Sequence, residues 1–264
     1  MNKEQLNEAN YNYWFHRAES YAEINRQELD GLQRNAWKQL IEQRIYNAFP
    51  NKLKREITIL DAGTGPGFFS IILAEAGYRV TAIDMTDSML SEARKNAGKL
   101  SSSITFLQMD AQELSFKDNY FDVVVSRNLT WVLPMPEKAY SEWQRVLKPG
   151  GILMVFDANW YHYLYDEEKR RAYEQDRANV KARSLDDHYL CTNIEAMEEI
   201  ARSVPLSRKQ RPQWDQQILE QMGMCRIRFK EDINNMVLSE TEKINYASSP
   251  YFMVEARKGE REAW

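Results

Sequence analysis

The chain has 264 residues, with 39 acidic and 35 basic side chains and a formal net charge of −4 at pH 7. At roughly 100–200 residues per domain, this length predicts one large domain, or one domain with an elaboration, whose core needs no disulfide framework. The slight acidity gives no general attraction to nucleic acid, and no apolar run is long enough to span a bilayer, so we expect neither as a partner.

The first 54 residues are expected to be helical. From residue 20 to about residue 48, apolar residues recur at helical spacing, which predicts an amphipathic helix. A dense aromatic cluster precedes it, and Tyr11, Trp14, Arg17 and Tyr21 fall three or four positions apart on one helical face. Two interpretations stay open: this face packs on the core, or it closes as a lid over a bound ligand.

Strands and helices then alternate. Short, β-branched and apolar runs predict five strands, at residues 57–60, 79–83, 104–108, 121–125 and 152–156. Helices are predicted between them, at residues 68–76, 87–97 and 136–147. This alternation is typical of an α/β protein with a Rossmann-like, doubly wound and mostly parallel sheet.

The pattern breaks after residue 159. The next fifty or so residues are polar and helical in composition, and we interpret them as a helical cap inserted after strand five. A helix at residues 214–222 and strands at 225–229 and 251–256 then complete a seven-stranded sheet. The predicted division is an N-terminal helical lid at 1–54, a Rossmann-like core at 55–159 and 209–264, and a cap at 160–208.

Polar residues and glycines stand where the predicted strands end. In an open α/β sheet the ligand lies beyond the carboxyl ends of the strands, so these residues are expected to converge on one crevice. They are residues 61–67, Asp84, Asp110, residues 126–128 and residues 157–159.

The turn after the first strand limits the kind of cofactor. Gly63, Gly65 and Gly67 allow a sharp bend and a close approach of the backbone to a flat ligand. A dinucleotide fingerprint would need its third glycine one residue later, where Phe68 stands. Asp61 precedes the glycines, and a carboxylate suits a cationic group better than a pyrophosphate. The turn therefore favours a cationic cofactor that carries an amino acid.

Residues 59–67, followed by Asp84, resemble the cofactor site of class I S-adenosylmethionine-dependent methyltransferases. The closest subgroup is the broad one that acts on small molecules, often labelled type 11. Residues 147–153 resemble that subgroup's turn before the fifth strand, and the whole resemblance covers residues 57–156. It implies S-adenosyl-L-methionine as the cofactor and an in-line transfer of its methyl group.

The resemblance also implies which residues bind the cofactor. The methionyl part and ribose would lie against the glycine turn, the ribose hydroxyls against the acid after the second strand, and the adenine against residues that follow the second and third strands. The lid would contribute aromatic groups that cage the sulfonium. The implied set is Asp61, Gly63, Gly65, Asp84, Met85, Asp110, Ala111, Arg127, Trp14, Arg17 and Tyr21.

The methyl acceptor is expected at the mouth of the crevice. Asn128, Trp131, Trp160 and Tyr161 follow the fourth and fifth strands and are the candidate acceptor residues, although Trp131 could equally fill core. His162 is the candidate general base, on position alone. The three histidines are scattered, so we predict no metal site.

The cysteines and the first ten residues indicate the cellular compartment that we expect for the protein. Cys191 and Cys225 lie far apart, lack CxxC spacing and fit a reducing cytoplasm, and residues 1–10 are too polar for a signal peptide. We predict a cytoplasmic methyltransferase for a small-molecule acceptor, as a monomer or homodimer. A non-catalytic relative that acts as an interaction module and an NAD-dependent oxidoreductase remain as alternatives.

Overall fold

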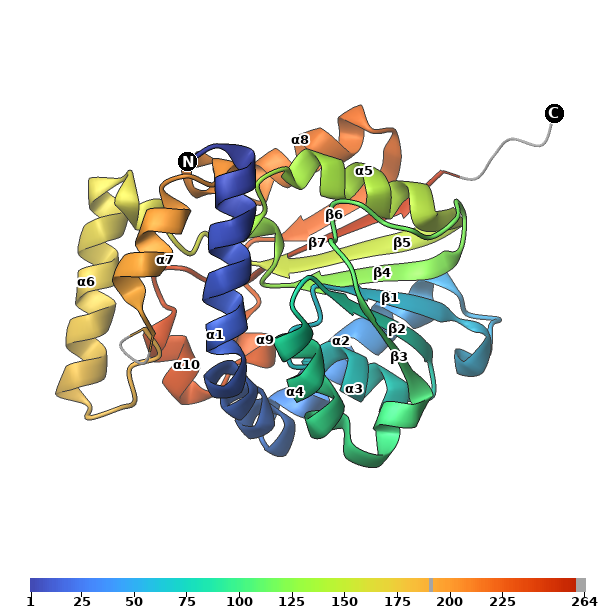
Figure 1. Ribbon diagram of the computed structural model, residues 1–264, viewed down its shortest axis with the longest axis horizontal. Helices are drawn as coiled ribbons and strands as arrows, with labels where there is room; N and C mark the ends of the chain where they lie inside the picture. Colours follow the sequence, from blue (N-terminus) through green and yellow to red (C-terminus); the bar gives the residue numbers. More distant parts are fainter. Residues whose placement is uncertain (190–191, 260–264) are drawn as a thin grey trace.

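The computed structural model describes residues 1–189 and 192–259 and shows one seven-stranded sheet in the order β3-β2-β1-β4-β5-β7-β6 (Figure 1). Strands β1 to β5 pair in parallel, and β7 runs antiparallel to both β5 and β6. The predicted Rossmann-like, mostly parallel sheet is confirmed. Its strands are β1 Thr58–Ala62, β2 Arg79–Asp84, β3 Ile104–Gln108, β4 Phe121–Arg127, β5 Leu147–Asp157, β6 Met224–Lys230 and β7 Phe252–Lys258.

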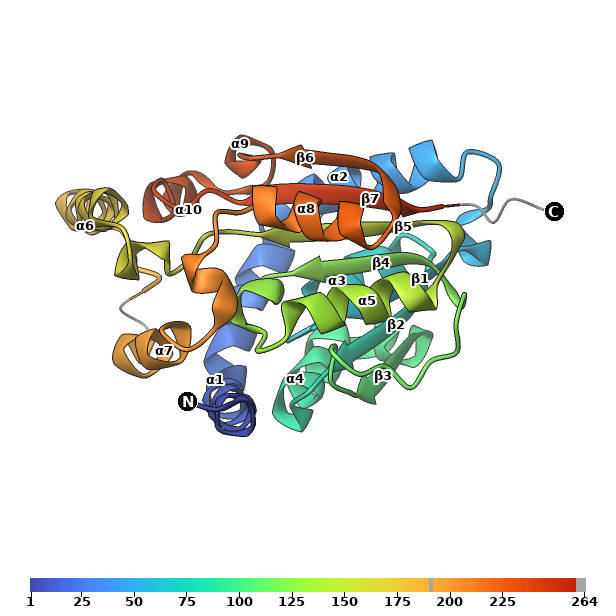
Figure 2. The same cartoon turned by 90° about the horizontal axis from the view of Figure 1, so that it is seen from above.

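Helices cover both faces of this sheet (Figure 2). Helices α5 (Pro136–Val146) and α8 (Gln213–Gln221) pack on one face, around the buried Tyr140, Trp143 and Leu219. Helices α2, α3 and α9 pack on the other face, and α4 lies against β2 and β3. Their bounds are α2 Gln33–Ala48, α3 Phe68–Glu75, α4 Asp87–Ala97 and α9 Asn234–Val237.

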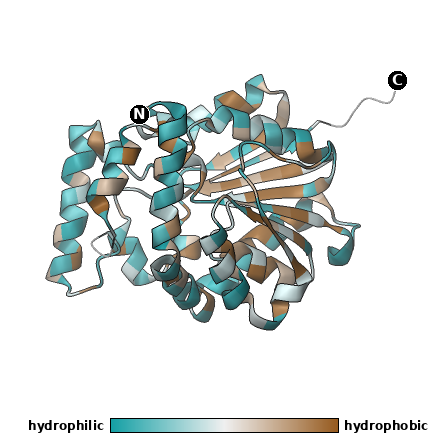
Figure 3. Cartoon of the chain, viewed as in Figure 1, coloured by the Kyte–Doolittle hydropathy of each residue, from teal (hydrophilic) through white to brown (hydrophobic). Residues whose placement is uncertain are grey.

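The central strands are apolar because both of their faces are covered. Six of the seven residues of β4 are buried, and the strands form the hydrophobic centre seen in Figure 3. Their carboxyl ends point toward helix α1, which crosses that edge of the sheet (Figure 1).

Helix α1 runs from Lys3 to Asp30, so the expected start near residue 20 is wrong. Asn2 and Gln5 form a capping box that fixes the true start. The helix is mostly polar, and this is why apolar periodicity did not reveal its first half. The chain then breaks around Gly31, and α2 is a separate helix whose Trp37 is fully buried in the core. Of these two helices, α1 lies over the strand ends.

The segment after β5 is helical, as expected, with α6 (Glu167–Ala182) and α7 (Ile194–Ala201) and no strand in its described part. Helix α7 packs on the first half of α1, and α6 packs against α10 (Glu240–Asn245). Helices α9 and α10 were not predicted; α10 lies beside the cap although it belongs to the last part of the chain (Figure 1). Within the described residues, no helix combines the length and apolar character needed to cross a bilayer.

Candidate functional site

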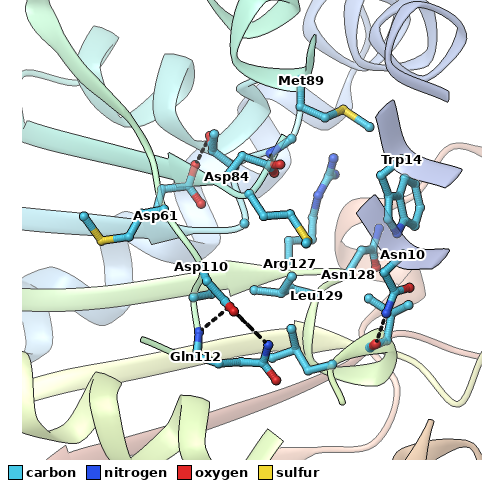
Figure 4. Close-up of a pocket in the computed structure, with 18 of the residues that line it drawn as sticks. Asn10, Trp14, Asp61, Asp84, Met89, Asp110, Gln112, Arg127, Asn128 and Leu129 are labelled. Carbon is cyan, nitrogen blue, oxygen red and sulfur yellow. Dashed lines mark hydrogen bonds between the residues drawn. The ribbon is translucent and has the colours of Figure 1, made fainter. Parts of the chain in front are cut away.

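A cavity lies at the carboxyl ends of β1 to β4, beneath α1. In an open α/β sheet this is the edge where ligands bind. Figure 4 shows Asp61, Asp84 and Asp110 on one side of the cavity and Asn10 and Trp14 of α1 on the other. Its lining includes all but one of the residues expected to bind the cofactor: Asp61, Gly63, Gly65, Asp84, Met85, Asp110, Ala111, Arg127, Trp14 and Tyr21.

The glycine turn after β1 has the conformation that only glycine adopts readily. Gly63, Gly65 and Gly67 have φ values of +71°, +52° and +92°. A Cβ on Gly63 would lie 2.7 Å from a methyl carbon of Leu129. A Cβ on Gly65 would instead meet only the ring of Tyr21, at 3.7 Å. Gly65 therefore leaves the cavity open toward α1.

Asp61, the last residue but one of β1, is only 2% exposed. Its Oδ2 accepts hydrogen bonds from Thr64 Oγ1 at 2.7 Å and Ser70 Oγ at 2.6 Å. Burial raises the pKa of Asp61, and these two hydroxyls oppose the rise. The residue ties the turn to helix α3 and also places its carboxyl group on the cavity wall.

Asp84 at the end of β2 holds the other side of the turn. Its Oδ2 accepts from the backbone N–H of Gly65 at 3.0 Å, and its Oδ1 accepts from Thr86 N at 3.0 Å and Thr86 Oγ1 at 2.9 Å. Burial raises the pKa of Asp84. Backbone N–H groups, that of Met85 among them, oppose this rise. Oδ2 accepts only one of the three bonds described above, so it keeps acceptor capacity for a ligand.

The third carboxylate borders an apolar slot. Asp110 accepts hydrogen bonds from Gln112 N at 2.8 Å and Gln112 Nε2 at 3.1 Å. Gln112 in turn accepts from the backbone of Met135 at 2.7 Å. Beside them the cavity is lined by apolar side chains. These are Met85, Met89, Met109 and Leu133. A slot with apolar walls and a fixed polar edge suits a flat heterocycle with exocyclic polar groups.

Arg127 lines the cavity, but its guanidinium is already paired. Its two terminal nitrogens donate to the two carboxylate oxygens of Glu28 at 2.9 and 2.8 Å, and its guanidinium carbon lies 4.4 Å from the ring centroid of Phe68. Burial raises the pKa of Glu28. Burial also acts to lower the pKa of Arg127, but the negative charge of Glu28 outweighs this effect, so the pKa of Arg127 is raised. The pair joins α1 to β4, and Arg127 positions the lid.

A second cavity adjoins the first. Trp14, Tyr21 and Asn128 line both cavities, so the two meet at these residues. All four candidate acceptor residues line the second cavity, and so does Arg17, which does not line the first. Its aromatic walls are Tyr13, Trp14, Tyr21, Trp131, Trp160, Tyr161, Tyr189, Tyr246 and Tyr251.

Two of these walls are held by one buried carboxylate that the sequence did not single out for this purpose. Asp157 accepts from the backbone of Trp131 at 3.0 Å and from Trp160 Nε1 at 3.2 Å. Arg211, 3% exposed, donates to Asp157 at 2.8 Å and also pairs with Asp215. This network holds the backbone of Trp131 and the indole of Trp160, while the indole Nε1 of Trp131 donates to the carbonyl of Asn128 at 3.1 Å.

The structure does not bring His162 to either cavity. It lies in the short turn after β5 and lines a separate cavity with Asn159, Asp166 and Lys169. The histidine on the second cavity is His188, whose Nδ1 lies 2.9 Å from the hydroxyl of Tyr246. Burial lowers the pKa of His188 and favours its neutral form. Sequence position gave no signal for it, because the cap brings it back over the strand ends.

Asn10 is a further lining residue that was not expected from the sequence. Its Nδ2 donates to the carbonyl of Val132 at 3.1 Å, and its buried Oδ1 has no partner among the described residues. Asn10, Trp14 and Tyr21 follow one another at helical spacing. This spacing is visible in the sequence, but Asn10 joins the set only when the helix is taken to begin before residue 10, as α1 does at Lys3.

Residues 60–155 match the family model described as a methyltransferase domain. The ubiquinone/menaquinone biosynthesis C-methyltransferase of Roseobacter denitrificans is 37% identical over 130 residues, covering 46% of this chain and 49% of that protein. The phosphatidylethanolamine N-methyltransferase of Cereibacter sphaeroides is 34% identical over 119 residues, covering 44% and 56%. The chain thus spans about half the length of these curated relatives.

A crystal structure from Methanococcus maripaludis, described as a candidate S-adenosyl-L-methionine-dependent methyltransferase, has the same fold. It superposes with a TM-score of 0.56 at 21% identity and covers 92% of this chain and 94% of that one. Sheet order and the structure match define a Rossmann-like α/β fold. Residues 60–155 match a methyltransferase domain, and over this part the chain is similar to known methyltransferases.

Proposed function

We propose that this chain transfers a methyl group from S-adenosyl-L-methionine, held in the first cavity, to a small molecule held in the second. The observation that carries the proposal is the junction of the two cavities at Trp14, Tyr21 and Asn128. A donor and an acceptor on either side of these residues would face each other. The two relatives named above are a C- and an N-methyltransferase, so their names do not fix the accepting atom.

The first cavity has features that suit this cofactor. Gly65 keeps the turn open toward the cavity. Glu28 neutralises the charge of Arg127, so the charged groups left to face a cationic donor are carboxylates. Asp61, Gly63 and Gly65 would hold the methionyl part and ribose, and Asp84 a ribose hydroxyl. Met85, Asp110 and Ala111 would hold the adenine, with Asn10 Oδ1 offering one more acceptor.

When bound, S-adenosyl-L-methionine supplies a methyl carbon that bonds to the acceptor's nucleophile while the electrons of the broken carbon–sulfur bond return to sulfur. The chain's own residues supply orientation and exclusion of water. Helix α1 covers the junction, and alignment of reactants can contribute roughly 7–11 kcal/mol to lowering a barrier. Where the accepting atom carries a proton, neutral His188 is placed on the acceptor cavity to receive it, which would add about 10²–10⁴-fold.

Calorimetric titration with S-adenosylhomocysteine tests the cofactor half of the proposal, with NAD as the comparison. We expect binding of the first and none of the second. Release of S-adenosylhomocysteine, followed over a panel of small metabolites, tests the transfer half. Absence of cofactor binding would leave the interaction module as the better interpretation, and binding of NAD alone would favour the oxidoreductase.

We further propose a cytoplasmic protein, monomeric or homodimeric, with no nucleic-acid or membrane partner. The exposed free thiol of Cys225 supports a reducing compartment, while Cys191 lies outside the described residues. The net charge of −4 supports the absence of a nucleic-acid partner. Sedimentation velocity would give the oligomeric state.

A further inference from the structure

The side chain of Asn128 stands at the junction of the two cavities with one end of its amide bonded and the other unbonded. Its Nδ2 donates to the Tyr251 hydroxyl at 2.6 Å and faces the Tyr21 hydroxyl at 3.5 Å. Its Oδ1 is buried and has no hydrogen-bond partner among the described residues. A buried acceptor without a partner is uncommon in native proteins and marks a position that needs an explanation.

The backbone of Asn128 is also unusual. Its φ is +56°, in the left-handed region, directly after the last residue of β4. This conformation turns the chain so that the amide faces the boundary between the cavities. An unfavourable backbone and an unpaired acceptor at the same residue point to a role in ligand binding, since such features persist at functional sites.

Most of the residues that line the second cavity are uncharged. The charged ones are Arg17, Glu28, which pairs with Arg127, and Glu242, which accepts from Gln33 Nε2 at 2.6 Å and from Ser239 Oγ at 2.6 Å. Most of the other walls are aromatic rings, several of them bearing hydroxyl groups, and such walls suit a flat ring.

We infer that Asn128 Oδ1 accepts a hydrogen bond from the methyl acceptor, and that this acceptor is an aromatic compound bearing an O–H or N–H group. The inference rests on the proposed function and names its substrate class. Asn128 acts as a positioning residue: its amide oxygen holds the donor-bearing atom at the junction and takes no proton. The ring would lie among Trp131, Trp160 and Tyr161, and Arg17 lines the same cavity and the groove outside it.

The test compares phenol with anisole, which has the same ring but no donor. Each is titrated into the protein saturated with S-adenosylhomocysteine, with binding followed by ligand-observed NMR. We expect the wild-type protein to prefer phenol by about tenfold, as one hydrogen bond predicts. In Asn128→Gly, which keeps the positive φ but lacks the amide, the two affinities should become equal.

Asn119→Gly is the matched control. Asn119 has nearly the same backbone conformation, with φ at +58°, and lines neither cavity. This variant should keep the wild-type preference for phenol. Thermal unfolding of both variants checks that the fold is retained.

Three results would overturn the inference while leaving the proposed function intact, since cofactor binding is measured separately. The first is equal affinity for phenol and anisole in the wild-type protein, or binding of neither. The second is an unchanged preference in Asn128→Gly. The third is an Asn128→Gly variant that loses affinity for S-adenosylhomocysteine by the same factor as for phenol, which would assign the amide to the cofactor.

Discussion

At the scale of single residues, Gly65 carries the clearest requirement of the cofactor site. Its φ of +52° and its open surroundings mean that an added side chain would enter the cavity rather than collide with the protein. We predict that Gly65→Val abolishes measurable binding of S-adenosylhomocysteine in calorimetry, because its side chain occupies the ligand's space and strains the turn.

Gly223 provides the control for backbone strain. It also has a positive φ, +76°, with no atom within 4 Å of the position that a Cβ would take, and it lies at the end of α8. Gly223→Val should lower the unfolding temperature without changing cofactor affinity. Tight binding by Gly65→Val would contradict the close approach of the ligand to this turn.

Asp84 tests the polar side of the same cavity. Removing its carboxylate takes away the acceptor capacity of Oδ2 and also the bond to Gly65 N. We predict that Asp84→Ala weakens binding of S-adenosylhomocysteine by about 1–3 kcal/mol. Asp87→Ala, at the exposed start of α4, should bind normally. Unchanged affinity in Asp84→Ala would remove Asp84 from the site.

At the scale of elements, sequence patterns predicted the sheet better than the lid. The strands are apolar runs between turns, and that signal is local, so β2 and β3 lie within one residue of their predicted bounds. Helix α1 has no such local signal, because its buried residues include the polar Asn10, Asn25 and Glu28. Partners far along the chain decide their burial, and no local pattern shows that.

One buried ion pair ties α1 to the end of β4. Glu28 and Arg127 have side chains that are only 10% and 8% exposed, and a charge left alone at such a place is destabilising. We predict that Glu28→Gln lowers the free energy of unfolding by about 3–5 kcal/mol and weakens cofactor binding, since α1 covers the cavity. Urea unfolding and calorimetry measure the two effects.

Glu23→Gln is the matched change on the same helix. Glu23 pairs with Arg26, but their side chains are 58% and 41% exposed. Such a surface pair contributes about 0–1 kcal/mol, so both the stability and the cofactor affinity of this variant should stay near wild type. Equal effects of the two substitutions would show that burial of the Glu28 pair is unimportant for the lid.

At the scale of the whole molecule, the first cavity could be predicted from sequence and most of the second could not. The carboxyl ends of neighbouring parallel strands meet by topology, so Asp61, Asp84 and Asp110 had to converge. The second cavity also draws on α1, the cap and the segment before β7, which meet only through tertiary packing. His188 and Tyr246 therefore emerged from the structure, whereas Trp160 was found because it follows a strand.

The edge of the sheet opposite the cavities contains a carboxylate that stabilises the fold without lining either cavity. Near the start of β4, Asp122 accepts hydrogen bonds from Lys52 Nζ at 2.6 Å, Lys148 Nζ at 2.8 Å and Thr58 N at 3.0 Å. Burial would raise the pKa of Asp122, but these bonds outweigh it and lower the pKa to about 2. An ordinary aspartate titrates near 3.9, so Asp122 stabilises the fold in its ionised form.

Because the pKa of Asp122 is lower in the folded state, its contribution is complete above about pH 4 and is lost as the pH falls toward about 2. We predict that Asp122→Asn lowers the free energy of unfolding at pH 7 by about 1–2 kcal/mol, a value reduced by the partial exposure of both lysines. The difference from wild type should shrink between about pH 4 and pH 2 in urea unfolding. Cofactor affinity at pH 7 should not change, since Asp122 lies at the far end of β4 from Arg127. A parallel loss of affinity would mean that the two edges of the sheet are coupled.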